Sequence, residues 1–388
     1  MRFEFATATR IIFGRGTVRE VGPSAVEMGG RAFVITGRSA ERAKPLLDQL
    51  KEHRIEYVTF SVPGEPTITM VKEGIESARR AKSDLVVSIG GGSALDAGKA
   101  IATMLTNPGE LEDYLEVVGL GKPLSNSPVP HIAIPTTAGT GAEVTRNAVL
   151  GVPDYQVKVS MRSPLMLPHL AVVDPELTHS MPPAVTAATG LDALTQLMEA
   201  YVSNKANPLT DGICREGLKK VGRSLRTAYE TGANHSARED MALASLFGGL
   251  ALANAKLGAV HGFAGPLGGM IGARHGVICA GLLPYVMQAN VEALQKRAAG
   301  SAALVRYDEV AGLITGRAEA QAADGLAWVQ ELCTTLKVPS LADFGLKEQD
   351  FPKVVAKAQK SGSMKGNPIA LTDDELMEIL DRANRQTK

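Results

Sequence analysis

The periodicity of the apolar residues changes once along this chain, near Met181-Pro182-Pro183. Before that point, short β-branched runs such as 32–35 and 85–89 alternate with helix-like stretches, the pattern of a parallel sheet with crossover helices. Beyond it, alanine- and leucine-rich helical patterning follows the two prolines, which are favoured in the first turn of a helix. The sequence therefore predicts an α/β domain over 1–180 and an all-helical domain over 181–388.

The length of the chain indicates more than one domain, and its balanced charge argues against nucleic acid or a membrane surface as a partner. The chain has 388 residues, too many for one ordinary core, and its 41 basic residues balance 41 acidic ones. Without clustered Lys or Arg there is no electrostatic footprint for nucleic acid or an anionic membrane. We therefore expect small molecules and copies of the same chain as partners.

The N-terminal residues and the spacing of the cysteines indicate the compartment of the protein. The first ten residues lack the apolar stretch of a signal peptide, and polar residues interrupt the most lipid-like segment, 241–271. The three cysteines, Cys214, Cys279 and Cys333, form no Cys-x-x-Cys pair, so neither a disulfide framework nor a thiolate zinc site is indicated. We expect a cytoplasmic protein whose cysteines are small buried side chains.

A glycine-rich turn follows the apolar run 85–89. The segment 88–93 reads Ser-Ile-Gly-Gly-Gly-Ser and precedes a helix-like stretch to 106. Glycines let the backbone approach a ligand closely, and the N–H groups at a helix start attract a pyrophosphate. The segment is neither Gly-x-Gly-x-x-Gly nor a Walker motif, and taken alone it could equally be a tight connection.

A second cluster, 134–145, also follows a short strand and contains four threonines, Thr136, Thr137, Thr140 and Thr145. Hydroxyls and open backbone amides suit ribose and phosphate oxygens. Both clusters fall at the carboxyl ends of predicted strands, where open α/β sheets bind ligands. Together they predict a dinucleotide site.

The residues after the strand at 33–35 bear on which dinucleotide is bound. They read Thr36-Gly37-Arg38-Ser39, without the acidic residue that would bind a ribose diol and repel a 2′-phosphate. Arg38 and Ser39 can contact phosphate oxygens, which predicts that NADP is used at least as well as NAD. The alternative is that Arg38 only points to solvent.

The helical half contains a candidate metal cluster. Asp192 and Gln196 share one helix face, and His261 and His275 lie downstream. One carboxylate and two imidazoles could bind a divalent metal, although the spacing of the histidines is no standard ligand interval. Hydrogen-bonded core histidines are the alternative.

Four segments together resemble the iron-containing, or group III, alcohol dehydrogenases: 90–93, 135–145, 190–196 and the region of His261 and His275. The ending Asn367-Pro368-x-x-Leu371-Thr372 is similar as well, so the resemblance spans nearly the whole chain. It implies a dehydroquinate synthase-like fold, with an active site between a dinucleotide domain and a helical domain. It also implies a homodimer or larger homo-oligomer.

The resemblance also assigns residues. The pyrophosphate would be held by Gly91, Gly92 and Ser93. The rest of the dinucleotide, NADP or NAD, would be lined by Gly37, Arg38, Ser39, Asp96, Thr136, Thr137, Thr140, Thr145, Lys158 and Leu177, the last near the adenine. The metal, Fe²⁺ or Zn²⁺, would be bound by Asp192, Gln196, His261 and His275, of which Asp192 and the two histidines are also the catalytic candidates.

Two positions depart from the family pattern, which has His where this chain has Gln196 and Gly265. An amide oxygen is a poorer ligand than imidazole for borderline ions, so a weakly bound metal is expected. The predicted function is hydride transfer between NAD(P)(H) and a small alcohol, aldehyde or ketone. The alternatives are a metal-independent enzyme like the maleylacetate reductases, a non-catalytic nucleotide-binding protein, and a lyase like dehydroquinate synthase, which the lack of a basic cluster disfavours.

Overall fold

The computed structural model describes residues 2–155 and 157–385, and these pack as two units. We call Ala6–His179 the sheet unit, and Ser180 onward, together with the first residues to Phe5, the helical unit. The predicted division into domains 1–180 and 181–388 stays a prediction.

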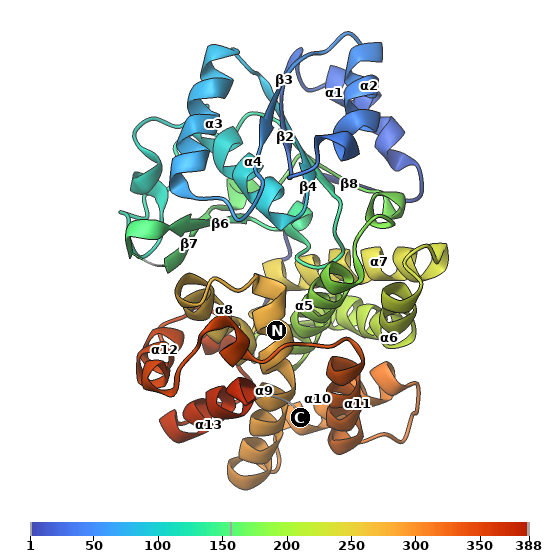
Figure 1. Ribbon diagram of the computed structural model, residues 1–388, viewed down its shortest axis with the longest axis vertical. Coiled ribbons are helices and arrows are strands. Elements are labelled where there is room, and N and C mark those ends of the chain that lie inside the picture. Colours follow the sequence, from blue (N-terminus) through green and yellow to red (C-terminus); the bar gives the residue numbers. More distant parts are fainter. Residues whose placement is uncertain (1, 156, 386–388) are drawn as a thin grey trace. The chain divides into compact units, whose positions relative to one another are not determined.

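A six-stranded parallel sheet is the centre of the sheet unit, with strand order β1-β8-β5-β4-β2-β3 among the described residues (Figure 1). The strands are β1 (Arg10–Phe13), β2 (Arg31–Thr36), β3 (Glu56–Ser61), β4 (Leu85–Gly90), β5 (His131–Pro135) and β8 (Leu170–Val173). A separate antiparallel pair consists of β6 (Asn147–Val152) and β7 (Val157–Arg162). All six residues of β4 are buried, as its uninterrupted apolar run predicts for a central strand.

Helices cover both faces of this sheet, with α1 (Val21–Val26) and α2 (Lys44–Glu52) on one face and α3 (Ile68–Arg80) and α4 (Gly92–Met104) on the other (Figure 1). The alternation of side chains along a strand sorts the residues between two cores. Phe33 and Ile35 of β2 pack with the buried residues of α3 and α4, whereas Val34 packs with those of α1 and α2. The sheet therefore lies between two layers of helices, each with its own core.

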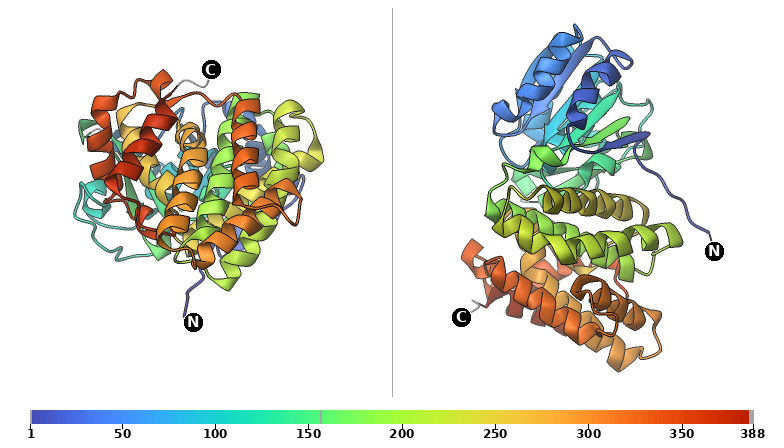
Figure 2. Two further views of the ribbon diagram at one scale, coloured as in Figure 1. Left: turned by 90° about the horizontal axis from the view of Figure 1, so that it is seen from below. Right: turned by 90° about the vertical axis from the view of Figure 1, so that its right-hand side faces the viewer.

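The helical unit consists of helices packed side by side (Figures 1 and 2). They are α5 (Pro183–Val202), α6 (Pro208–Glu230), α7 (His235–Asn254), α8 (Ala259–Met270), α9 (His275–Arg297), α10 (Ala302–Thr315), α11 (Ala322–Thr335), α12 (Phe351–Ala358) and α13 (Asp373–Asn384). Helix α5 lies against α6, α7, α9 and α10, so nearly all of its residues from Gly190 onward are buried. The predicted fold class, an α/β part followed by an all-helical part, is confirmed.

One helix of the described residues, α9, is long and apolar enough by composition to cross a membrane, and α7 and α8 pass the same test only as a pair bent by 96°. Helix α9 packs against α5, α8 and α11, and two thirds of its apolar window is buried inside the structure. Its composition is therefore that of the central helix of a bundle.

Candidate active site

The two glycine- and threonine-containing clusters predicted to bind the dinucleotide meet at the carboxyl end of the sheet. Strands β4 and β5 are neighbours with Gly90 opposite Pro135, and the Thr136 N–H donates to the Gly90 carbonyl over 2.8 Å. A Cβ built on Gly91 would lie 3.3 Å from the side chain of Thr137, and one on Gly92 would lie 2.9 Å from Thr140 Oγ1. The sequence segments, over forty residues apart, form one continuous surface of backbone and hydroxyls.

Helix α4 starts at this surface. Gly91 is its N-cap residue, in an extended conformation, and no side chain of the described structure caps this end. The N–H groups of the first turn of a helix lack intrahelical partners and carry partial positive charge. The start of α4 can therefore bind an anion such as a pyrophosphate.

A buried lysine that the sequence analysis did not single out organises the far side of this surface. Lys99 of α4 donates to Thr145 Oγ1 over 2.9 Å, forms an ion pair with Asp96 over 2.9 Å and bonds the Asn147 carbonyl. Asp96 in turn accepts from the Val149 N–H over 3.0 Å. Asp96 and Thr145, both predicted cofactor residues, thus have partners within the protein. A lone lysine in the apolar run 94–104 was the sequence feature that could have indicated this role.

The remaining predicted cofactor residues lie on other parts of the sheet unit. Gly37, Arg38 and Ser39 follow β2, the neighbour of β4, and Arg38 Nε donates to the Pro63 carbonyl over 3.3 Å. Lys158 on β7 forms an ion pair with Glu65. Leu177 follows β8 and packs against the sheet core.

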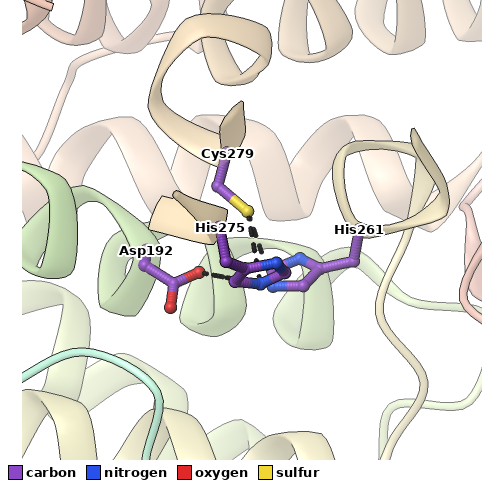
Figure 3. Close-up of side chains that lie close together, drawn as sticks. All are labelled: Asp192, His261, His275 and Cys279. Atoms are coloured by element: carbon purple, nitrogen blue, oxygen red, sulfur yellow. Dashed lines mark hydrogen bonds and ion pairs between the residues drawn. The ribbon is translucent and has the colours of Figure 1, made fainter. Parts of the chain in front are cut away.

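In the helical unit, the predicted metal cluster is assembled from three helices (Figure 3). Asp192 comes from α5, His261 from α8, and His275 is the first residue of α9. Asp192 Oδ1 lies 3.5 Å from His261 Nε2 and 3.6 Å from His275 Nε2. The side chains of Asp192 and His261 are 1% and 6% exposed, and that of His275 is 37% exposed, so the cluster is accessible from the His275 side.

Glu199 of α5, which the sequence analysis missed, fixes the orientation of His261. One of its oxygens lies 2.7 Å from His261 Nδ1, so that nitrogen donates its proton to Glu199 and Nε2 faces the cluster. Its other oxygen accepts from the Val260 N–H over 2.7 Å and so satisfies an open amide at the start of α8. A carboxylate behind a ligating imidazole is the usual second contact of a protein metal site. Glu199 follows Asp192 by seven residues, two helical turns, and that spacing could have indicated it.

Close backbone approaches bring these helices together. A Cβ on Gly258, just before α8, would lie 2.8 Å from both Glu199 Oε1 and Asn367 Oδ1. A Cβ on Gly276 would lie 2.5 Å from the Ala188 carbonyl of α5. Glycine at these two positions is therefore what allows α8 and α9 to bring their histidines up to α5.

Gln196 lies on the other side of Asp192 from the histidines. Its Nε2 donates to Asp192 Oδ2 over 3.3 Å, whereas the histidines surround Oδ1. The oxygen Oε1 of Gln196 faces Gly248 of α7, where a Cβ would approach it to 2.9 Å. Gln196 is thus placed to orient the carboxylate.

The charges of the cluster are strongly coupled. Burial alone would lower the pKa of His275, but Cys279 and Asp192 outweigh it and raise that pKa to about 9. Burial is likewise outweighed at His261, whose pKa lies well above its ordinary value because of Cys279, Asp192 and Glu199. At Asp192 the two histidines outweigh burial and lower the pKa of the carboxyl. The cluster therefore pairs a carboxylate with imidazoles that hold protons. A divalent cation would compete with those protons for the imidazole nitrogens.

The donors fit a divalent ion. Asp192 Oδ1 is buried and has no hydrogen-bond partner, although two imidazole nitrogens face it. A buried carboxylate oxygen left without a hydrogen bond is costly unless a charge satisfies it. One oxygen and two nitrogens that converge on one point are a donor set for zinc or iron.

Comparison with known proteins shows the family of this chain. The family model "Iron-containing alcohol dehydrogenase" matches residues 8–175, and "Fe-containing alcohol dehydrogenase family, C-terminal" matches residues 186–384. The chain is 37% identical over 390 residues to the 1,3-propanediol dehydrogenase of Klebsiella pneumoniae, covering 98% of each chain. It is 34% identical over 382 residues to the NAD-dependent methanol dehydrogenase of Bacillus methanolicus, covering 96% of this chain and 97% of the relative. The crystal structure of a 1,3-propanediol oxidoreductase matches with a TM-score of 0.89 at 35% identity, covering 99% of this chain and 100% of the other.

Fold, glycine turn and carboxylate–imidazole cluster are thus those of an oxidoreductase that acts on alcohols by hydride transfer. Within that class, the chain belongs to the iron-containing alcohol dehydrogenase family, as its sequence segments predicted.

Proposed function

We propose that this alcohol dehydrogenase transfers a hydride between NAD(P)(H), held at the start of α4, and a small alcohol or carbonyl compound whose oxygen lies at Asp192, His261 and His275 with a divalent metal. The observation that supports this most directly is Asp192 Oδ1, which faces two imidazole nitrogens at 3.5 and 3.6 Å and has no hydrogen bond. When bound, the metal would supply Lewis-acid polarisation of the substrate oxygen, which lowers the pKa of an alcohol.

The residues of the chain have separate roles in this proposal. Glu199 keeps the proton of His261 on Nδ1 and so leaves Nε2 facing the cluster. The backbone at Gly91 and Gly92 binds the pyrophosphate, and the hydride chemistry belongs to the nicotinamide. Because glycine stands at position 265, where a Cβ would meet nothing within 4 Å, no side chain there takes the alcohol proton, which passes to water or a ribose hydroxyl.

The cofactor preference is the finer part of the proposal. Gly37, Arg38 and Ser39 follow β2 with no acidic side chain among them, which supports NADP at least as well as NAD. Arg38 already donates to the Pro63 carbonyl, so only its terminal nitrogens are placed to meet a phosphate. A homo-oligomer in the cytoplasm remains our expectation for the assembly and its location.

A metal-independent reductase is the second candidate. It is favoured by two partners of Asp192 that need no ion: the Gln196 amide, which donates a hydrogen bond, and the His275 imidazole, whose raised pKa lets it carry a positive charge.

One experiment separates the two candidates. Protein stripped with a chelator is assayed with a panel of aldehydes and NADH or NADPH, before and after addition of Fe²⁺, Zn²⁺ or Mn²⁺. We expect activity to depend on the added ion and kcat/KM for NADPH to equal or exceed that for NADH. Full activity in the stripped protein would favour the metal-independent reductase, and a preference for NADH of more than about tenfold would contradict the cofactor assignment.

A further inference from the structure

Cys279 lies within the predicted metal cluster, although no Cys-x-x-Cys motif indicates a thiolate site. It follows His275 by one turn of α9, is completely buried, and points toward the two imidazole rings (Figure 3). Its Sγ lies 3.6 Å from His275 Nε2 and 3.9 Å from His261 Nε2. Donor atoms of Asp192, His261, His275 and Cys279 all lie within 4.8 Å of one another.

Four of the six separations between these atoms are close to the edges of a coordination tetrahedron. Zinc bond lengths of about 2.1 Å to oxygen or nitrogen and about 2.3 Å to sulfur give edges of about 3.4 Å for O–N and about 3.6 Å for N–S pairs. The observed O–N distances are 3.5 and 3.6 Å, and the observed N–S distances are 3.6 and 3.9 Å. The two imidazole nitrogens lie at N–H···S hydrogen-bond distance from Cys279 Sγ and at ion-pair distance from Asp192 Oδ1, so the donors face one another across one point.

Gln196, predicted as a weak fourth ligand or as a group that supports the ligands, contacts the other oxygen of Asp192. Its amide nitrogen bonds Asp192 Oδ2, and its oxygen lies against Gly248 of α7. The oxygen of Asp192 that faces the histidines is Oδ1, the atom without a hydrogen bond. Cys279 is on the Oδ1 side, and Gln196 is on the Oδ2 side.

We propose that the Cys279 thiolate is the fourth protein ligand of a divalent ion bound by Asp192, His261 and His275, and that Gln196 positions Asp192. This inference rests on the proposed metal-dependent function, in which the substrate oxygen would add to the ion as a fifth ligand. Ion binding would release to solvent the proton of the Cys279 thiol and any proton on the two Nε2 atoms, while the sulfur and both nitrogens each donate an electron pair to the ion. A site with one thiolate, two imidazoles and one carboxylate selects zinc or cobalt over hard ions such as Mg²⁺ and Mn²⁺.

The other two cysteines provide matched controls within the same unit. Cys214 is buried in α6 beside apolar residues, and Cys333 of α11 has its Sγ 3.8 Å from the Ala280 carbonyl. Neither belongs to the cluster of metal-ligating side chains found among the described residues.

The test uses Co²⁺ as a spectroscopic substitute in chelator-stripped full-length protein. Thiolate ligation gives a charge-transfer absorption in the near ultraviolet, and cobalt in any tetrahedral site gives visible bands. We expect both in the wild type and in the Cys214→Ser and Cys333→Ser variants. In Cys279→Ser the near-ultraviolet band should disappear, while visible bands remain, and binding of Zn²⁺ should weaken more than binding of Mn²⁺.

A second measurement needs no variant. X-ray absorption at the zinc edge of the reconstituted wild type counts sulfur ligands, and we expect one. Visible cobalt bands without the thiolate band, or zinc without sulfur, would overturn the role of Cys279 and leave the metal-dependent function standing. If neither Co²⁺ nor Zn²⁺ binds, both the thiolate site and the metal-dependent function are wrong, and the aldehyde assay then reports on hydride transfer alone.

Discussion

The cofactor surface of the sheet unit and the metal cluster of the helical unit are built from different material. The first consists of backbone and short hydroxyl side chains at the ends of two neighbouring strands, β4 and β5. The second consists of four side chains from three helices, supported by Glu199. Backbone sites are fixed by strand register, whereas side-chain clusters depend on how distant helices pack.

The difference teaches where each site can fail. In the sheet unit, a single added side chain can obstruct the surface without removing any ligand group. In the helical unit, removal of one donor leaves the remaining charges buried and unsatisfied. The four predictions that follow test this contrast, from the largest expected effect to the smallest.

The substitution His261→Ala should have the largest effect. It removes one nitrogen donor and the partner of Glu199, so we expect loss of both bound metal and dehydrogenase activity. Elemental analysis measures the bound metal, and turnover with an aldehyde and NADPH measures the activity. His235→Ala is the control, because His235 starts α7 and is absent from the cluster. Wild-type activity in the His261 variant would mean that the side-chain cluster is not the reaction centre.

Gly91→Val should weaken cofactor binding by about 100-fold, or about 2.7 kcal/mol, because a branched side chain fills the approach to the α4 amides. A Cβ at this position already lies 3.3 Å from Thr137. Fluorescence titration with NADPH measures the affinity. Gly30→Val, in the same unit but before β2 and with open space around its Cβ, should bind normally. Unchanged affinity in the Gly91 variant would make the turn purely structural.

The third prediction concerns Glu143, a buried carboxyl within the threonine cluster 134–145, and tests the stability of the fold. Burial raises its pKa to about 7, against the opposing effects of its own backbone amide and Lys99. Between its ordinary pKa and about pH 7, the Glu143 carboxyl keeps its proton in the folded state and loses it in the unfolded state. The contribution of this proton to the free energy of unfolding is therefore complete at low pH and is lost as pH rises through about 7. Glu143→Gln should remove about 2 kcal/mol of pH dependence between about pH 5.5 and pH 7.

Calorimetric unfolding at several pH values tests this, because the single tryptophan, Trp328, lies in the helical unit and does not report on Glu143. Glu65→Gln, an exposed partner of Lys158, is the control. Equal pH dependence in wild type and the Glu143 variant would show that the carboxyl is already ionised in the fold.

Glu199→Gln should give the smallest effect, a loss of about tenfold in metal affinity, at the lower end of what supporting groups behind ligands contribute. The amide oxygen can still accept from the Val260 N–H, but the imidazole loses a charged partner. Competition with a chelating dye measures the affinity. The control is Glu309→Gln, which alters a carboxylate bonded to Tyr201 and Arg215 and should leave the metal affinity unchanged. Equal affinities in the two variants would contradict the support role of Glu199.

The contrast between the two sites also explains what could be predicted from the sequence. The glycine turn and the threonine cluster are local motifs, each at the carboxyl end of a strand. Because the carboxyl ends of parallel strands lie at one edge of the sheet, where ligands bind, the two motifs could be expected to meet. The helix start at the two prolines was equally local, and the structure begins α5 at Pro183.

The metal cluster needed more than local pattern. Asp192 and the two histidines were selected by family resemblance, and the structure brings them together. Cys279 was treated as a small buried side chain, because a single cysteine has no motif until α9 places it against two imidazoles. Gln196 was assigned from the same pattern, and only the packing of α7 shows which oxygen of Asp192 it reaches.

The first turn of α8 depends on a residue far along the chain. The Ala259 N–H donates to Asn367 Oδ1 over 3.1 Å, across 108 positions, and Asn367 also donates to Asn290 Oδ1 over 2.6 Å. During synthesis from the N-terminus, the sheet unit can fold while this partner has not yet been made. The helix that presents His261 acquires its full set of bonds only when Asn367 leaves the ribosome. We therefore expect the proposed ion to bind late in synthesis, after residues 6–179 have emerged.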